Sequence, residues 1–342
     1  MSDKNKKKVD IFAVAKRSGV SISTVSRSLN HPGQVKPATR KKIDRAIRDL
    51  GYIRNRAAQT MHGIRSGTIG LVVPTIDHTI FAELIHAFSQ SVEEQGFLIL
   101  VASHGYDLEK EYAVVRKFLE HRVDGVALIG QDHSEETYQL LESNGTPAIS
   151  MWNHDPASRL SCVGSDNALA GQLAAQCLRD HGHRYIGLLF PPRQENDRAR
   201  GRFEGAMRTL EAAGIRPEAD MSAQALYSLR EAKDAVTGLL RRPDRPTALL
   251  CGNDVLAAGA LYRATELGLK VPEDLSIIGI GDFRGSEEMT PALTTVRLPA
   301  REIGHLAGQQ LAAIIGGHTA QTIRIDCAIR LNVRQTCRRI GD

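Results

Sequence analysis

From Thr68 onward, short apolar runs alternate with longer stretches that have helical periodicity. Runs of this length, bounded by polar turns, are typical of strands buried in a parallel sheet, and the stretches between them (81–95 and 108–119, for example) read as crossover helices. The runs form two series, residues 69–73, 97–101, 125–129 and 148–151, then residues 186–190, 248–251 and 275–280. Two such series predict an α/β fold of two doubly wound lobes, in which a ligand lies beyond the carboxyl ends of the strands.

Charge is distributed unevenly along the 342 residues, a length that favours more than one folding unit. Residues 1–67 contain sixteen Lys and Arg against four Asp, a net charge of +12, whereas the rest of the chain contains 28 basic and 35 acidic residues, a net charge of −7. A small basic head on a mildly acidic body indicates that only the head faces a polyanion. A solvated lysine tail would explain Lys4 to Lys8, but not an excess that continues to Arg65.

The basic head has the pattern of two short helices joined by a tight turn. Asp10 can cap a helix whose apolar residues recur at helical spacing, and Gly19 ends it. A second helix follows at once in residues 20–30, with Ser21 as its natural cap. Two helices joined in this way form a helix-turn-helix, whose second helix presents its N-terminal residues to base edges in the major groove.

The faces of the second helix and a third helix support this interpretation. An inward face of Val20, Val25 and Leu29 lies opposite an outward face of Ile22, Ser23, Ser26 and Arg27. Small polar side chains and one arginine suit contacts in a groove. Residues 37–50, which begin at a proline and end before Gly51, predict a third helix that closes the core and leaves Arg40, Lys41 and Arg45 near phosphates.

The motifs AVAKRSGVSISTVSRSLN and VKPATRKKIDRAIRDLGY resemble the headpiece of LacI-type repressors, and the resemblance continues through IGLVVPTIDHTIFAEL, RVDGVALI, GHRYIGLL, CGNDVLAAGAL and TPALTTV. It covers nearly the whole chain and implies a sequence-specific DNA-binding transcriptional regulator, expected to be a repressor, whose operator affinity changes when a small molecule binds. The implied domains are a helix-turn-helix headpiece (1–53), a hinge helix and linker (54–67), and a periplasmic-binding-protein-like effector and dimerisation domain (68–342). Its lobe 1 is expected at about 68–165 and 296–324, and its lobe 2 at about 166–295 and 325–342.

By this resemblance, ten residues are expected to bind DNA: Ser21, Ile22, Ser23, Thr24, Ser26, Arg27 and Asn30 in the headpiece, and Asn55, Ala58 and Met61 in the hinge. The hinge segment is too short to be a stable isolated helix. In the family it orders only on operator DNA, pairs with its dimer mate and inserts an apolar side chain into the minor groove. Met61 stands where the family usually has leucine, and its flexible thioether can still part a base step. The other interpretation of Met61 is a linker residue or core filler. Arg54 replaces the proline that the family tends to have.

Ten further residues are expected around an effector: His78, Phe81, Gln131, Trp152, Arg198, Arg202, Tyr227, Asn253, Asp254 and Asp282. Gln131 and Trp152 follow from their positions at strand ends, and an indole gives a flat wall on which a sugar ring can stack. By resemblance, Arg202 belongs to the RxxG signature whose arginine reaches the effector, and Arg198 matches another position in the pocket. Two alternatives stay open, a surface position for His78 and a lobe-packing role for Trp152.

The expected effector is a sugar or sugar acid, with gluconate or a ketogluconate preferred. A guanidinium is the natural partner of a carboxylate. In the family the strand before Asp282 commonly ends in Gly-(Tyr/Phe)-Asp, whereas this chain reads Gly279-Ile-Gly-Asp, which displaces the acid by one residue. That form, together with His104-Gly-Tyr106, is similar to the gluconate-repressor branch of the family.

Other features restrict the class of protein. Five cysteines without a CxxC spacing indicate free thiols in a reducing cytoplasm, and no signal peptide, membrane span or cofactor is expected. Two alternatives have the same lobes: a sugar-acid-using enzyme, for which no P-loop, GxSxG or HExxH motif is present, and a transport-type sugar-binding protein, which would need an export signal. The regulator is expected to be a homodimer on a pseudo-palindromic operator, and tetramers held by a C-terminal leucine-heptad bundle are not expected.

Overall fold

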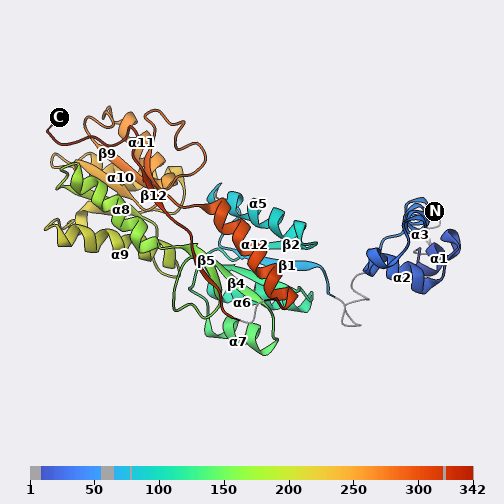
Figure 1. Cartoon of the computed structure of the whole chain (residues 1–342). Coiled ribbons are helices and arrows are strands. Elements are labelled where there is room, and N and C mark those ends of the chain that lie inside the picture. The colour runs from blue at the N-terminus through green and yellow to red at the C-terminus, as the bar shows by residue number, and fades with distance from the viewer. Residues whose placement is uncertain (1–8, 55–64, 78, 319–320, 342) are drawn as a thin grey trace, which may run out of the picture. The chain divides into compact units, whose positions relative to one another are not determined.

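The computed structural model describes residues 9–54, 65–77, 79–318 and 321–341. The chain divides into two units, Met1–Ser66 and Gly67–Asp342, each with its own core (Figure 1). None of the described helices combines the length and the apolar composition needed to cross a bilayer.

The first unit, over residues 9–54, consists of α1 (Ile11–Ser18), α2 (Ile22–Asn30), a 3-10 turn (Pro32–Gln34) and α3 (Pro37–Leu50). Asp10 caps α1 by accepting a hydrogen bond from the amide of Ala13 at 2.9 Å. Gly19 ends α1 with a φ of 70°, a left-handed conformation that glycine adopts without strain. The buried core residues are Val14, Ala15, Val25, Ile43 and Ala46. The helix-turn-helix pattern and the third helix are therefore confirmed.

The second unit contains two six-stranded sheets with helices on both faces, as predicted. The first sheet has the order β11-β5-β4-β3-β1-β2 and is parallel. Its strands are β1 (Thr68–Val73), β2 (Leu98–Ser103), β3 (Gly125–Ile129), β4 (Ala148–Asn153), β5 (Ser161–Ser165) and β11 (Arg324–Asp326). Its helices are α5 (Thr79–Glu94), α6 (Leu108–Glu120), α7 (Glu135–Ser143) and α12 (Ala300–Gly316).

The second sheet has the order β12-β10-β9-β8-β6-β7, and only the pairing of β10 with β12 is antiparallel. Its strands are β6 (Ile186–Phe190), β7 (Ser222–Gln224), β8 (Ala248–Cys251), β9 (Ser276–Gly281), β10 (Thr294–Arg297) and β12 (Arg330–Asn332). Its helices are α8 (Asn167–Asp180), α9 (Asp197–Ala212), α10 (Leu229–Leu240) and α11 (Asp254–Glu266), with a 3-10 turn at Ala219–Met221.

Alternate strand residues fill the cores on the two faces of each sheet, because successive side chains of a strand point to opposite faces. In the first sheet Leu71 packs toward α5 and α12, whereas Val72 packs toward α6 and α7. In the second sheet Leu188 packs toward α8 and α9, whereas Leu189 packs toward α10 and α11.

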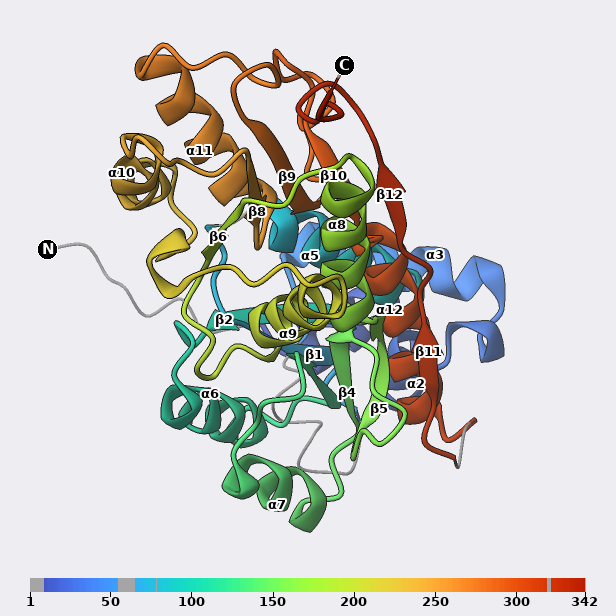
Figure 2. The same cartoon turned by 90° about the vertical axis from the view of Figure 1, so that its left-hand side faces the viewer.

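The chain passes between the lobes three times in its described part: from β5 to α8, from β10 to α12, and from β11 to β12 (Figure 2). The expected crossing at residue 296 falls inside β10, so the strands place this crossing after Arg297. The expected crossing at 325 likewise falls inside β11.

Candidate functional site

The outward face of α2 is the first candidate site. Ile22 is 39% exposed, and Ser23 and Arg27 are also exposed. Ser21 caps the helix by accepting a hydrogen bond from the amide of Thr24 at 3.2 Å, and its hydroxyl also bonds the hydroxyls of Ser23 (2.9 Å) and Thr24 (2.8 Å). The helix therefore begins with a group of hydroxyls followed by an isoleucine and an arginine, side chains that can meet base edges and phosphates.

Asn30, the last residue of α2, is held by hydrogen bonds to two side chains. Asn30 donates a hydrogen bond to Ser26 Oγ at 3.2 Å, and its side-chain oxygen accepts one from Arg54, which also bonds the carbonyl oxygen of Leu29. Arg54 stands at the position where the family tends to have proline. Its two hydrogen bonds connect the segment that follows α3 to the C-terminal end of α2. The predicted hinge residues Asn55, Ala58 and Met61 lie outside the described residues.

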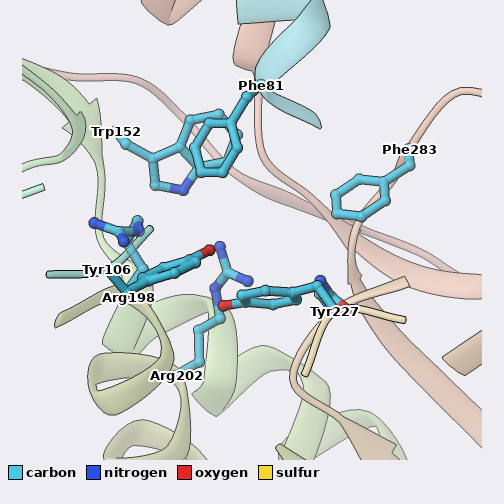
Figure 3. A pocket seen from close by; sticks show the side chains of 8 residues that line it. Phe81, Tyr106, Trp152, Arg198, Arg202, Tyr227 and Phe283 are labelled. Carbon is cyan, nitrogen blue, oxygen red and sulfur yellow. The ribbon is translucent and has the colours of Figure 1, made fainter. Parts of the chain in front are cut away.

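The second candidate site is a small cavity between the two lobes, lined by residues of both. Figure 3 shows its lining, five aromatic rings with two arginines and an asparagine: Phe81, Tyr106, Trp152, Arg198, Arg202, Tyr227, Asn253 and Phe283. The rings are arranged in pairs. Phe81 and Trp152 have centroids 5.8 Å apart, and the rings of Tyr106 and Tyr227 stack across the lobes at 5.9 Å.

Arg202 is a buried charge in the lining of the cavity, with an exposed fraction of 4%. Its Nε donates to Asn167 Oδ1 at 2.8 Å and its Nη1 donates to the carbonyl oxygen of Gly252 at 2.9 Å. Both acceptors are neutral, and no carboxylate of the described residues forms an ion pair with this guanidinium. Burial lowers the pKa of Arg202. In Figure 3 the guanidinium lies between the hydroxyl groups of Tyr106 and Tyr227.

Arg198 differs from Arg202 because its charge is already balanced. Its Nη1 donates to Asp197 Oδ1 at 2.8 Å and to the carbonyl oxygen of Ile129 at 3.3 Å. Its guanidinium carbon lies 5.9 Å from the centre of the Tyr106 ring. Asp197 also bonds lobe 1, since its Oδ2 accepts from the backbone amide of Gln131 and from the side-chain amide of Asn153, both at 2.6 Å.

Six of the ten predicted effector residues line this cavity, namely Phe81, Trp152, Arg198, Arg202, Tyr227 and Asn253. His78 lies outside the described residues. The other three are held by hydrogen bonds elsewhere. Gln131 bonds Ser150, Ser158 and the carbonyl oxygen of Asn153.

Asp254 and Asp282 do not line this cavity, and both carboxylates have partners outside its lining. Asp254 accepts hydrogen bonds from the amide of Phe283 (2.8 Å) and from the hydroxyls of Ser286 (2.8 Å) and Thr295 (2.6 Å). Its burial raises its pKa. Asp282 forms an ion pair with Arg334 at 2.7 Å and accepts a hydrogen bond from Asn332. Asp254 thus positions Phe283 in the cavity instead of lining it.

Tyr106 and Phe283 line the cavity but are absent from the predicted set. Each follows the carboxyl end of a strand, Tyr106 after β2 and Phe283 after β9. The rule that selected Gln131 and Trp152 would therefore have selected both rings. Among the described residues, no group of three or more His, Cys, Asp or Glu side chains could hold a metal ion.

Comparison with known proteins identifies relatives along both units. Residues 11–55 match the bacterial regulatory proteins of the lacI family, and residues 175–337 match a periplasmic binding protein-like domain. The HTH-type transcriptional regulator GntR of Pseudomonas aeruginosa is 31% identical over 327 residues, 94% of both chains. The HTH-type transcriptional repressor PurR of Proteus mirabilis is 33% identical over 317 residues, 91% of this chain and 92% of the relative. The lac repressor dimer bound to operator and an anti-inducer superposes with a TM-score of 0.84 at 26% identity, over 97% of this chain and 100% of that chain.

Proposed function

The chain belongs to the lacI family of bacterial regulatory proteins, and from that premise we propose that its effector is an anionic sugar, a sugar acid of the gluconate or ketogluconate type. The broader function follows from the family itself: the chain is a DNA-binding, ligand-regulated transcriptional regulator. Its relatives are named regulators and repressors, which confirms the expectation of a regulator over an enzyme.

The observation that carries the proposal is the isolated charge of Arg202. A buried cation is costly unless an anion or several hydrogen bonds compensate for it. The described partners of Arg202 are two neutral oxygens, and the lining of the cavity contains two arginines and no carboxylate. A ligand carboxylate beside Arg202 would supply the missing charge, and the planar guanidinium is suited to bind it through two parallel hydrogen bonds.

The rest of the lining suits the body of a sugar acid. Aromatic rings give flat apolar walls for the C–H faces of a polyol, while the hydroxyls of Tyr106 and Tyr227 and the amide of Asn253 can bond its hydroxyl groups. A neutral sugar would use the same walls but would leave the charge of Arg202 uncompensated. A periplasmic transport protein has no use for a headpiece, so this alternative does not account for residues 9–54.

The proposed mechanism links this cavity to operator DNA. Two headpieces of a homodimer read the half-sites of a pseudo-palindrome in the cytoplasm, with Ile22, Ser23 and Arg27 in the major groove and Met61 in the minor groove. The lac repressor, a structural relative, was solved as a dimer on its operator, which supports this arrangement. Because the cavity is lined from both lobes, an effector that prefers one lobe arrangement shifts operator affinity, by about 1–3 kcal/mol in typical cases.

A binding experiment tests the effector class. Trp152 is the only tryptophan and lies in the cavity, so its fluorescence reports ligand binding directly. We expect D-gluconate or a ketogluconate to change this fluorescence and to raise the melting temperature, and D-glucose, a neutral sugar with the same number of carbons, to do neither. A hit is then added to operator gel shifts. Binding confined to neutral sugars or to purines would contradict the proposal.

A variant pair tests the role of Arg202. Arg202→Gln should weaken sugar-acid binding by about 1.5–3 kcal/mol, roughly 10- to 150-fold, because a hydrogen-bonded ion pair is lost. Arg208, an exposed arginine on the same helix, provides the control Arg208→Gln, which should bind as the unmodified protein does. Full affinity in Arg202→Gln would show that the cavity assignment is wrong.

A further inference from the structure

Glu111 of α6 and His133 of the loop after β3 are buried in contact with each other beneath the lobe 1 wall of the cavity. The Nδ1 of His133 lies 2.8 Å from Glu111 Oε1, and the two side chains are 0% and 1% exposed. Neither residue lines the cavity. A buried carboxylate that touches no ligand needs a physical reason, because its desolvation is costly.

Both ring nitrogens of His133 face hydrogen-bond acceptors. Nδ1 meets the carboxylate of Glu111, and Nε2 lies 3.0 Å from the carbonyl oxygen of Gly130. A neutral imidazole has only one N–H, so it can satisfy only one of these acceptors, whereas an imidazolium satisfies both. An imidazolium beside an ionised Glu111 therefore satisfies both contacts, whereas a neutral ring satisfies both only if Glu111 itself carries the proton.

The carbonyl group that His133 holds belongs to the segment on which Arg198 rests. Gly130 O also accepts a hydrogen bond from Ser150 Oγ at 2.6 Å, so its peptide group is fixed from two sides. On the other side of this segment, Ile129 O accepts from Arg198 Nη1 and the amide of Gln131 donates to Asp197. The Arg198 guanidinium lies very close to the backbone of Gly130, since a Cβ added to this glycine would be only 2.3 Å from Arg198 Nη1.

The other ionisable and aromatic side chains around Glu111 and His133 do not replace either residue in this contact. His104 Nε2 lies 3.9 Å from Glu111 Oε2, beyond hydrogen-bond distance, and that oxygen has no hydrogen-bond partner among the described residues. Tyr138 packs edge-on against the His133 ring, and its hydroxyl donates to Gln131 O. Two cations of lobe 2 reach this part of lobe 1, and both are already paired, Arg198 with Asp197 and Arg200 with Asp132. Glu111 is thus the carboxylate that directly contacts His133.

We propose that Glu111 and His133 form a buried ion pair that fixes the backbone of residues 129–131 against Arg198. Glu111 and His133 are then positioning residues for the effector cavity. The effector part of this inference rests on the proposed function, whereas the ion pair and the position of Arg198 do not. Residues that orient a binding group from behind determine how well it is preorganised, although they touch no ligand.

The charge state of His133 is measured without any ligand. Imidazole ¹⁵N spectra of the full-length protein report which ring nitrogens of each histidine carry a proton. We expect one histidine with the signature of two protonated nitrogens, its loss in His133→Gln, and a neutral ring in Glu111→Gln. A neutral His133 in the unmodified protein would overturn the ion pair. His121, exposed at the end of α6, supplies the control His121→Gln, which should leave the signal unchanged.

The positioning role is measured by crystallography and by binding. In a crystal structure of ligand-free Glu111→Gln, we expect Arg198 to lose its contact with Ile129 O, and an unmoved Arg198 would overturn this role. If D-gluconate binds the unmodified protein, Glu111→Gln and His133→Gln should each weaken it by at least about tenfold, and the double variant should be no weaker than the singles. Additive losses would argue against a single unit. If D-gluconate does not bind, the proposed effector is wrong, while the spectra and the crystal structure still test this inference.

Discussion

A Cβ on Gly205 of α9 would lie 1.9 Å from the carbonyl oxygen of Ala168 on α8. Only glycine permits so close an approach of two helix backbones, and Gly171 has the same relation to Arg202, whose carbonyl oxygen would lie 1.8 Å from an added Cβ. This contact brings α9 close enough to α8 for Arg202 to reach Asn167. The two ends of the RxxG signature are therefore physically linked, because its glycine sets the helix spacing that its arginine requires.

Gly205→Ala should consequently damage the cavity from a distance. Inserting a methyl group into a tight contact costs about 1–3 kcal/mol, and here backbone atoms must move. We expect a lower melting temperature and weaker sugar-acid binding in the Trp152 fluorescence titration. The matched control is Gly201→Ala on the same helix, whose added Cβ would meet its nearest neighbour at 3.4 Å, an ordinary contact. It should be neutral or stabilising by up to about 1 kcal/mol, and equal damage in both variants would contradict the close-contact explanation.

Arg27→Ala should reduce sequence-specific operator binding. Arg27 is exposed on α2, on the face that we propose reads base edges. Loss of such a contact costs about 1–3 kcal/mol and relaxes discrimination at one base pair. Gel shifts on operator and on unrelated DNA distinguish the loss of a base contact, which weakens binding to the operator alone, from the loss of a phosphate contact, which weakens binding to both. Arg48→Ala, an exposed arginine near the end of α3, should cause a small loss that is the same on both DNAs. A loss for Arg27→Ala that is equal on both DNAs would assign Arg27 to phosphate contact only.

The pH dependence of stability should reflect His104. Burial lowers the pKa of its imidazole, so the folded protein favours the neutral ring while the unfolded chain takes up a proton near pH 6.5. This contribution is therefore fully present above pH 6.5 and is lost as the pH falls below it, by at most about 1.4 kcal/mol per pH unit. Melting temperatures between pH 7 and pH 5.5 should fall less steeply in His104→Gln than in His121→Gln, the exposed control. Parallel curves would contradict a buried neutral His104.

The sequence predicted most of the strands because their buried residues form apolar runs, and β5 shows why some were missed. Its residues are Ser, Cys, Val, Gly and Ser, all buried, yet only Val163 is a strong strand former. The polar ones are satisfied by tertiary partners far along the chain: Ser161 Oγ accepts from the amide of Ile323, and Ser165 Oγ donates to Cys327 O. Small residues also allow Gly164 to lie close to Asn153 of β4. Hydropathy does not encode these partners.

The sequence likewise predicted most, but not all, of the residues that line the cavity. Position at a strand end identifies which residues are near the cavity, but not which of them turn toward it. Trp152 and Asp282 both have positive φ, 84° and 54°, yet Trp152 lines the cavity whereas Asp282 pairs with Arg334. Arg334 lies 52 positions later in the sequence, and no local pattern relates the two.

Asp197→Asn should weaken the connection between the lobes at the cavity. The carboxylate joins lobe 2 to Gln131 and Asn153 of lobe 1 while neutralising Arg198. Removing one partner of a buried ion pair leaves the other charge uncompensated and costs about 3–5 kcal/mol. We expect a clear fall in melting temperature and at least about tenfold weaker sugar-acid binding. The matched control, Asp132→Asn, breaks the ion pair between Asp132 of lobe 1 and Arg200 of lobe 2, in which Arg200 is 41% exposed. Partly exposed pairs contribute only about 0–1 kcal/mol, so this variant should change little. Equal effects of the two variants would mean that Asp197 is no more important to the joined lobes than a surface pair.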